Sequence, residues 1–124
     1  MDRSVEKLLL AAQDTGIANA ARAWQLKNDS AAGTAEELNA RMAEALSVMR
    51  DAAEKGLDPN LRSVSRLTGG NAAKLMRAAV SGQTMGGSLL GRICARALAV
   101  AECNAAMGRI VAAPTAGACG ILPG

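Results

Sequence analysis

One stretch of the chain, residues 34–55, constrains the fold most, because it carries both a start and a stop for a helix. Thr34 is followed three positions later by Glu37, a pair that forms a capping box, in which each side chain binds the backbone amide of the other residue. Gly56 and Pro59 end the pattern, since glycine favours the position after a helix and proline cannot continue one. Between these signals, apolar residues at helical spacing define one apolar face: Leu38, Met42, Leu46, Met49 and Ala53.

Signals of the same kind predict further helices over residues 4–13, 17–27, 71–80 and about 87–107. Asn71 is expected to cap the third of these, and residues 57–70 read as a connector. Small residues recur every four positions in the last helix and favour close helix packing: Gly87, Gly91, Ala95 and Ala99.

Composition agrees with an all-α fold. The chain has no Phe, no Tyr and a single Trp, Trp24, whereas the helix-forming residues Ala, Leu and Met are abundant. Its 124 residues leave room for one domain with one core. An alanine-rich core buries little area per residue, so we expect it to need a partner surface. The expected fold is a compact helical domain over residues 1–124 that ends in a Gly/Pro-rich loop carrying a cysteine.

Charge is distributed unevenly along the chain. Residues 1–60 carry seven basic and ten acidic side chains, a net charge of −3, whereas residues 61–124 carry seven basic side chains and only Glu102, a net charge of +6. A basic half attracts nucleic acid, an acidic partner or small carboxylates. Nucleic acid is the weakest of these readings, because aromatic residues for base stacking are missing and the arginines are scattered.

The absence of histidine removes the commonest general base and nitrogen ligand for metals from this chain. Three cysteines without a Cys-x-x-Cys pair, and a charged N-terminus unlike a signal peptide, predict a reduced, cytoplasmic protein. The apolar stretch 89–101 is interrupted by Arg92 and Arg96, so it is too short and too charged to span a membrane.

Two features suggest sites, each with a simpler alternative. Cys94 and Cys103 lie nine residues apart on one helix, on opposite faces, so we interpret both as buried packing residues. Gly69 and Gly70 precede a helix at Asn71, where free backbone amides can bind an anion or a substrate carboxylate; the alternative is an ordinary turn.

The segment Ala-Pro-Thr-Ala-Gly-Ala-Cys-Gly, residues 113–120, is the strongest candidate. Small residues surround Cys119, and Gly117 and Gly120 give the backbone freedom on either side. We expect an accessible sulfur with many amides near it, which suits an iron–sulfur ligand or a reactive thiolate; a buried loop cysteine is the alternative. One cysteine cannot hold a cluster, so further ligands would have to come from elsewhere.

The sequence from Asn104 to Gly124, with its Pro-Thr-x-Gly-x-Cys-Gly motif, closely resembles bacterial iron–sulfur L-serine dehydratases, in their alpha subunit or domain. The resemblance extends upstream through residues 36–57 and 67–110, from about Val5. It implies an L-serine ammonia-lyase of amino-acid catabolism that forms pyruvate and ammonia with a 4Fe–4S cluster and no pyridoxal phosphate. Three cysteines hold the cluster in this family and leave one iron open as a Lewis acid.

Carried over by the motif, Cys119 would be the first cluster ligand, and the other two would lie downstream. The chain then resembles the N-terminal part of an alpha subunit, inactive alone, and catalytic groups would come from a beta subunit or beta domain. Asn104, Arg109 and Thr115 are candidates to orient the substrate, and Gly117 extends the anion-loop candidates Gly69, Gly70 and Asn71. The general base stays unassigned, an oligomer is expected, and neither nucleic acid nor a membrane is an expected partner.

Two other interpretations compete with this one. The helices could form a non-catalytic interaction or scaffold module, in which the alanine-rich faces serve association only. A pyridoxal-phosphate lyase is disfavoured, because the Ser-x-Lys-x-Arg-Gly pattern of that class is missing and Lys74 is not followed by the Ser or Thr of a phosphate loop.

Overall fold

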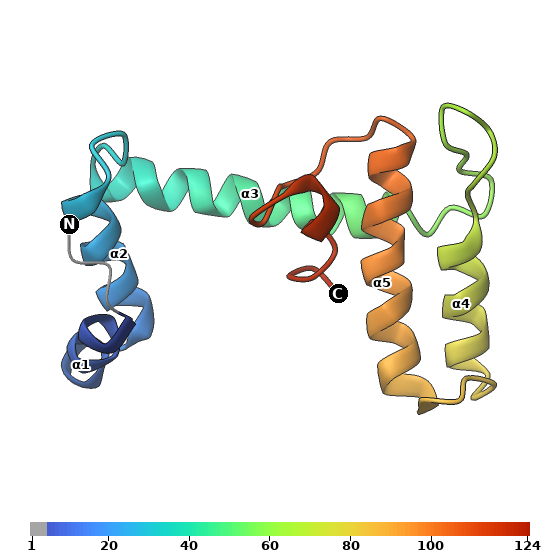
Figure 1. Cartoon of the computed structure of the whole chain (residues 1–124), viewed down its shortest axis with the longest axis horizontal. Coiled ribbons are helices and arrows are strands. Elements are labelled where there is room, and N and C mark those ends of the chain that lie inside the picture. The colour runs from blue at the N-terminus through green and yellow to red at the C-terminus, as the bar shows by residue number, and fades with distance from the viewer. Residues whose placement is uncertain (1–4) are drawn as a thin grey trace. The chain divides into compact units, whose positions relative to one another are not determined.

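A computed structural model of the chain describes residues 5–124, and the regular secondary structure of this part consists of helices without strands. The elements are α1 (Val5–Thr15), α2 (Ile17–Asn28), α3 (Ala35–Lys55), α4 (Asn71–Val80), α5 (Gly87–Ala105) and the short 3₁₀ helix η1 (Ala116–Ala118) (Figure 1). The predicted all-α class is therefore confirmed. Each predicted helix is present with its ends within about two residues, except that residue 4, the expected start of the first, lies outside the described residues.

The chain divides into two compact units, Met1–Glu44 and Ala45–Gly124, where its length had suggested one core. The boundary falls inside α3. In the first unit α1 packs against α2, and Gly16 joins them with a φ of 80°, a conformation that glycine adopts without strain. Ala20, Ala32 and Leu38 are the buried apolar residues described in this unit, and Trp24 is half-buried.

The capping box at the start of α3 has formed. The backbone amide of Glu37 donates to Thr34 Oγ1 at 3.2 Å, and the amide of Thr34 donates to Glu37 Oε2 at 2.8 Å. These reciprocal bonds satisfy two amides that a helix start otherwise leaves without partners.

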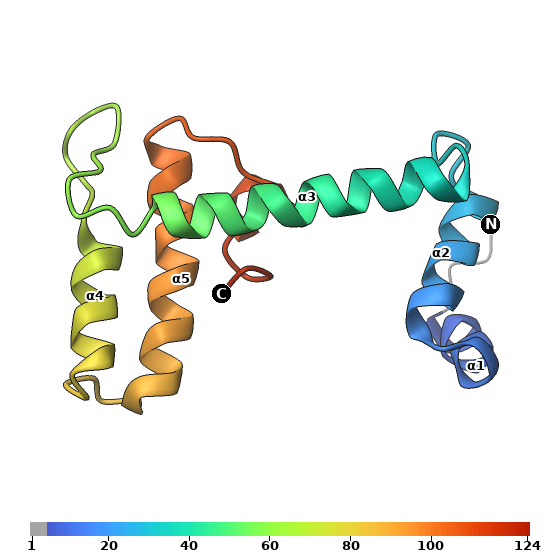
Figure 2. The same ribbon diagram turned by 180° about the vertical axis from the view of Figure 1, so that it is seen from behind.

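In the second unit α4 and α5 lie side by side (Figures 1 and 2). The predicted stripe of small residues explains how they approach: Gly91, Ala95 and Ala99 are buried, and a Cβ at Gly91 would lie 2.7 Å from Cβ of Ala79 on α4. Gly87, the first member of the stripe, is exposed at the start of α5 and takes no part.

α3 ends where predicted, but Gly56 serves a different purpose. Its φ is not positive, so it is not the left-handed residue that commonly follows a helix. A Cβ at Gly56 would instead overlap the backbone carbonyl of Ala99, so glycine here permits the end of α3 to touch α5.

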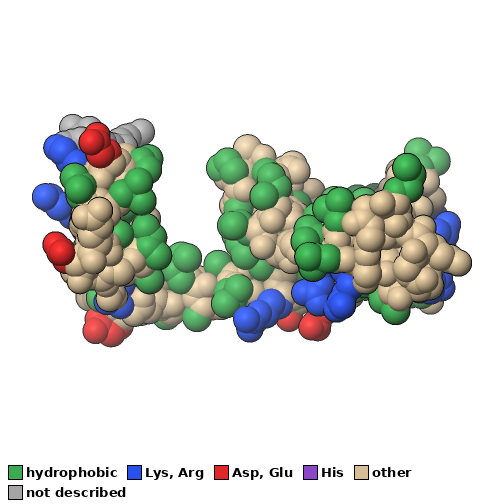
Figure 3. Space-filling model, turned by 90° about the horizontal axis from the view of Figure 1, so that it is seen from below, with side chains coloured by type: hydrophobic (Ala, Val, Ile, Leu, Met, Phe, Trp, Pro, Cys, Tyr) green, Lys and Arg blue, Asp and Glu red, His purple; other side chains and the backbone are tan. Residues whose placement is uncertain are grey.

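The predicted apolar face of α3 is only partly buried. Leu38 and Ala53 are buried and Met49 is half-buried, but Met42 and Leu46 are exposed. Val48 and Ala52 are buried in addition. Hydrophobic side chains are accordingly visible at the surface in Figure 3. None of the helices within residues 5–124 combines the length and apolarity needed to cross a membrane.

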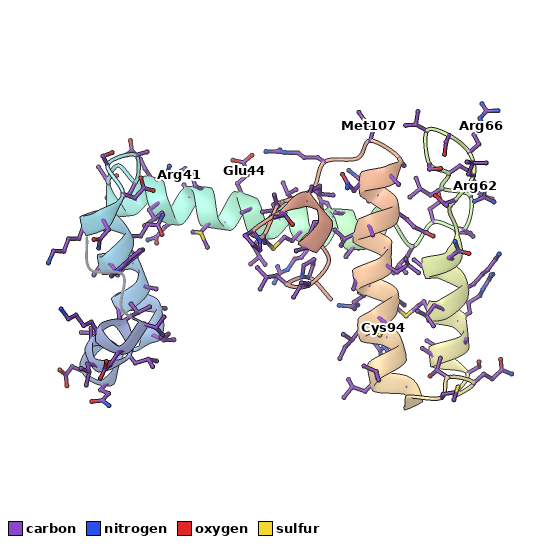
Figure 4. All side chains as sticks on the ribbon, in the orientation of Figure 1. Arg41, Glu44, Arg62, Arg66, Cys94 and Met107 are labelled. Carbon is purple, nitrogen blue, oxygen red and sulfur yellow. The ribbon has the colours of Figure 1, made fainter. Side chains whose placement is uncertain are left out.

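The connector, residues 57–70, has no helix, as predicted. It is tied to α5 by the amide of Val64, which donates to the carbonyl of Ala105 at 3.1 Å. Its own turn is closed by the amide of Ser63, which donates to the Thr68 carbonyl at 2.9 Å. Arg62 and Arg66 lie on this connector, and Met107 lies where the chain leaves α5 (Figure 4).

Candidate functional site

A short turn holds the cysteine of the C-terminal motif. Thr115 caps η1: its Oγ1 accepts from the amide of Ala118 at 3.3 Å, and its carbonyl accepts from the amides of Ala113 and Ala118 at 3.3 and 3.1 Å. Cys119 follows η1 directly, and its amide donates to the Ala116 carbonyl at 3.4 Å. Thr115 thus sets the direction in which the chain presents Cys119.

The sulfur of Cys119 is not accessible, contrary to the prediction. The residue is 2% exposed and belongs to a buried cluster with Ala52, Ala53, Val100 and Cys103. The small residues around Cys119 therefore serve close packing: a Cβ at the next residue, Gly120, would overlap the carbonyl of Ala97 on α5.

The other two cysteines differ from each other. Cys103 is buried, as expected, but Cys94 is exposed, so its interpretation as a packing residue was wrong (Figure 4). Their placement on opposite faces of α5 follows from the nine-residue spacing. Burial raises the pKa of the Cys103 thiol, the positive charge of Lys55 partly lowers it, and the electrostatic interaction with Cys119 raises it further.

Glu102 is the site residue whose role the sequence did not reveal. It is 6% exposed and points its carboxylate at the N-terminus of α4, where the amides of Gly70 and Asn71 donate at 3.0 and 2.9 Å. The amide of Ala72 adds a longer bond of 3.4 Å. The signal was present: Glu102 is the one acidic residue among residues 61–124, and it lies on an apolar helix where an unpaired carboxylate is costly.

This carboxylate occupies the predicted anion loop. Asn71 does not cap α4 through its side chain: the cap position is Gly70, in a left-handed conformation with a φ of 76°. Position 69 requires glycine, because a Cβ there would overlap the carbonyl of Leu61. The amides of the loop bind an anion, as expected of a helix N-terminus, but that anion is a side chain of the chain itself.

The candidates for substrate orientation lie along the segment that leads from α5 to Cys119. Asn104 is exposed in the last turn of α5, Arg109 is exposed beyond it, and Thr115 is exposed at the cap of η1. Gly117 is exposed within η1. These four residues share a segment only because they are close in the sequence. All four are exposed, whereas Cys119 is buried.

A cavity of about 280 Å³ lies in the second unit, and none of the candidates for substrate orientation lines it. Its walls come from the second half of α3, from α5 and from the C-terminal residues, and include Leu46, Arg50, Glu54, Arg96 and Leu122. Ala53 lines the cavity and also belongs to the cluster around Cys119. Among residues 5–124 there is no group of three His, Cys, Asp or Glu side chains that could hold a metal ion.

Comparison with known proteins shows one family. The protein-family model described as serine dehydratase alpha chain matches residues 5–124. The chain is 44% identical over 91 residues to the probable L-serine dehydratase, alpha chain, of Bacillus subtilis, which covers 73% of this chain and 30% of that protein. It is 39% identical over 119 residues to L-serine dehydratase 2 of Escherichia coli, which covers 90% of this chain and 25% of that protein.

A third relative is the L-serine dehydratase, alpha chain, of Peptoniphilus asaccharolyticus, 37% identical over 90 residues, 73% of this chain and 31% of that protein. The chain thus spans about a quarter to a third of the length of these relatives. No match was found among solved structures. Because the family match runs through nearly the whole chain, including the turn that carries Cys119, this chain belongs to the serine dehydratase alpha chain family.

Proposed function

We propose that this chain forms part of a lyase that deaminates L-serine to pyruvate and ammonia with a 4Fe–4S cluster. The observation that carries the proposal is the family match over residues 5–124, which includes the Cys119 motif, together with relatives named L-serine dehydratase. Since the chain spans about a quarter to a third of these relatives, we expect it to be inactive on its own.

The residues of this chain fit one corner of such a cluster. Cys119 supplies a thiol at the end of a capped turn, within an apolar shell of the kind that surrounds iron–sulfur clusters. Because this residue is 2% exposed, the turn would have to move away from its buried cluster before the sulfur could bind iron. With no group of three ligating side chains among residues 5–124, the remaining ligands must come from outside this part of the protein. When bound, the cluster would supply an open iron that acts as a Lewis acid on the serine hydroxyl.

The chain's own contribution is to hold that thiol and to attract the substrate. The Thr115 hydroxyl accepts a hydrogen bond from the Ala118 amide, and a hydroxyl that accepts can also donate its proton, here to a substrate oxygen. Asn104 and Arg109 offer an amide and a positive charge on the same segment, and the net charge of +6 over residues 61–124 favours a carboxylate. Gly117, exposed beside them, gives a substrate room to approach the backbone.

The loop at Gly69, Gly70 and Asn71 has no role in substrate binding in this proposal. Its amides bind Glu102, and a substrate carboxylate would have to displace a buried side chain that already satisfies them. We therefore assign this loop to positioning α4 against α5.

The partners follow from the exposed apolar surface. Leu89, Leu90, Ile121 and Leu122 are all more than half exposed, which is costly unless another surface covers them. A beta subunit or beta domain, as the name alpha chain of the relatives implies, and further copies in an oligomer are the proposed partners. Three free cysteines agree with a reduced cytoplasmic location.

A graft tests the proposal in a complete enzyme. This chain replaces the matched segment of the Escherichia coli L-serine dehydratase 2, and the product is reconstituted anaerobically with ferrous iron and sulfide. We expect pyruvate from L-serine and a broad visible absorbance, both lost in Cys119→Ser and both kept in Cys94→Ser. The isolated chain, treated identically, should form no pyruvate.

Other outcomes would contradict separate parts of the proposal. An unchanged absorbance in Cys119→Ser would remove Cys119 from the ligand set. A graft that folds and assembles but forms neither cluster nor pyruvate would favour the alternative, a non-catalytic helical scaffold.

A further inference from the structure

Two of the three thiols of this chain lie in one buried apolar cluster. Cys103 is 3% exposed and Cys119 is 2% exposed, and both belong to the cluster with Ala52, Ala53 and Val100. We propose that Cys103 and Cys119 form a redox-sensitive dithiol, which closes reversibly to a disulfide while Cys94 stays free.

The path of the backbone brings the two cysteines together. Cys103 lies in the last turns of α5, and Cys119 follows η1, sixteen residues later. Between them the chain turns back on the helix with small residues at the points of contact: a Cβ at Gly108 would overlap Sγ of Cys103, and one at Gly120 would overlap the Ala97 carbonyl. The returning segment therefore lies directly on α5.

The returning segment is held in a way that permits opening. Within residues 110–124, the backbone hydrogen bonds that the structure describes have both partners in the segment itself, such as Ile121 to Ala118 and Gly124 to Gly120. Apolar packing of Cys119 and Ile110 holds it against the rest of the unit. A segment without described backbone hydrogen bonds to the rest of its unit opens locally at less than the cost of global unfolding, so a small oxidant can reach both thiols.

The oxidant is a hydroperoxide. One thiolate attacks an oxygen of the hydroperoxide and becomes a sulfenic acid as the O–O bond breaks; with hydrogen peroxide the leaving group is hydroxide, which takes up the proton lost by the thiol and leaves as water. The second thiolate then attacks the sulfenic sulfur, forms the S–S bond and displaces hydroxide, which leaves as water after protonation. Two thiols and one hydrogen peroxide thus give one disulfide and two waters, and a dithiol reductant reverses the change.

The disulfide and the proposed cluster compete for the same sulfur. This consequence rests on the proposed function: if Cys119 is a cluster ligand, the oxidised chain has no thiolate to offer and cannot take up iron and sulfide. The disulfide itself requires no cluster, so the two ideas are tested separately.

Trypsin places each cysteine on its own peptide, because arginines at positions 92, 96 and 109 separate residues 93–96, 97–109 and 110–124. The native chain is treated with hydrogen peroxide without iron, and remaining thiols are blocked before digestion. We expect a disulfide-linked pair of peptides 97–109 and 110–124, a blocked Cys94, and a fall in free thiols from three to one, all restored by reductant. A linked pair that contains Cys94, or three free thiols, would overturn the proposal.

Two controls show that the fold directs the pairing. In Cys94→Ser the linked peptides should form as in the unsubstituted chain, and in Cys103→Ser they should be absent. In denaturant, Cys94 and Cys103 are closer along the chain than Cys103 and Cys119, so their pairing should increase because shorter loops close more easily. The same mixture of disulfides in native and denatured chains would refute a preformed dithiol.

The effect on cluster loading is measured in the graft described above. Peroxide treatment before reconstitution should abolish the visible absorbance, and reductant should restore it. If the disulfide forms but absorbance in the graft does not depend on Cys119, the proposed ligand role fails and the dithiol stands. If absorbance depends on Cys119 but no linked peptides form, the dithiol fails and the ligand role stands.

Discussion

The carboxylate of Glu102 accepts a hydrogen bond of 2.9 Å from the backbone amide of Asn71, and so joins the end of α5 to the start of α4. The two residues are 31 positions apart in the chain, and Glu102 also binds the amide of Gly70 at 3.0 Å. A helix N-terminus carries partial positive charge and free amides. A buried carboxylate there therefore serves both as a counter-charge and as a cap. The pairing fixes how the two main helices of the second unit meet.

Replacing this carboxylate should destabilise the second unit. Glu102→Gln keeps the shape but puts an amide group where only acceptors fit, so we expect the free energy of unfolding to fall by about 1–3 kcal/mol. Urea unfolding followed by circular dichroism measures the change. Glu54→Gln, which alters an exposed carboxylate on α3, is the matched control and should have little effect. Equal losses in both variants would show that Glu102 does not act as the cap.

The capping box at Thr34 makes a separate prediction for the first unit. Thr34→Ala removes the acceptor for the Glu37 amide and should cost about 0.5–2 kcal/mol, whereas Thr34→Ser should keep most of the stability. Trp24 is the single tryptophan of the chain and lies in this unit, so its fluorescence during urea unfolding reports the loss directly. If Thr34→Ser is as unstable as Thr34→Ala, the hydroxyl cap is not the cause.

Neither Gly56 nor Gly117 has a positive φ, so alanine at either position tests steric contact and not backbone strain. Gly56→Ala pushes a methyl group into the carbonyl of Ala99 and should cost about 1–3 kcal/mol through overpacking. In Gly117→Ala the new Cβ would lie 3.8 Å from Thr115 Oγ1, an ordinary contact, so stability should hardly change. Thermal unfolding of both variants measures the change in stability. If Gly56→Ala barely lowers the free energy of unfolding, then α3 and α5 can move apart without a loss of stability.

The pH dependence of stability should report on Cys103. Burial raises its pKa from the ordinary value of 9.0, so at higher pH the unfolded chain loses its thiol proton before the folded chain does. The free energy of unfolding therefore falls as the pH rises through the ordinary value towards the folded one. Urea unfolding between neutral and alkaline pH measures this decline, which should be smaller in Cys103→Ala. An identical decline in that variant would assign it to other groups.

Alkylation rates give an independent measure of the burial of Cys103, by comparison with the exposed Cys94. Iodoacetamide should label the exposed Cys94 first, and Cys103 more slowly and at higher pH, because the thiolate is the reactive form. Peptides 93–96 and 97–109 separate the two sites for mass spectrometry. Equal rates at the two cysteines in the native chain would contradict the burial of Cys103.

Sequence alone was sufficient for the helices and for the family. Thr34, Glu37 and Pro59 mark the ends of α3 because caps and breakers act through hydrogen bonds and steric limits within a few residues. The Pro-Thr-x-Gly-x-Cys-Gly motif around Cys119 likewise identified the serine dehydratase resemblance that the family match confirms.

The environment of each site residue was decided only by tertiary structure. Cys119 was expected to be accessible and is buried. Met42 and Leu46 lie on the predicted apolar face of α3 but are exposed. Gly56 ends α3 as predicted, but it does so by permitting contact with α5 and not through a left-handed conformation. Glu102 was noticed as an isolated acid, but its partners lie about 30 residues earlier in the chain. Burial, hydrogen-bond pairing and steric contact depend on which helices and loops pack together. Those contacts join residues far apart in the sequence, so local sequence patterns do not predict them.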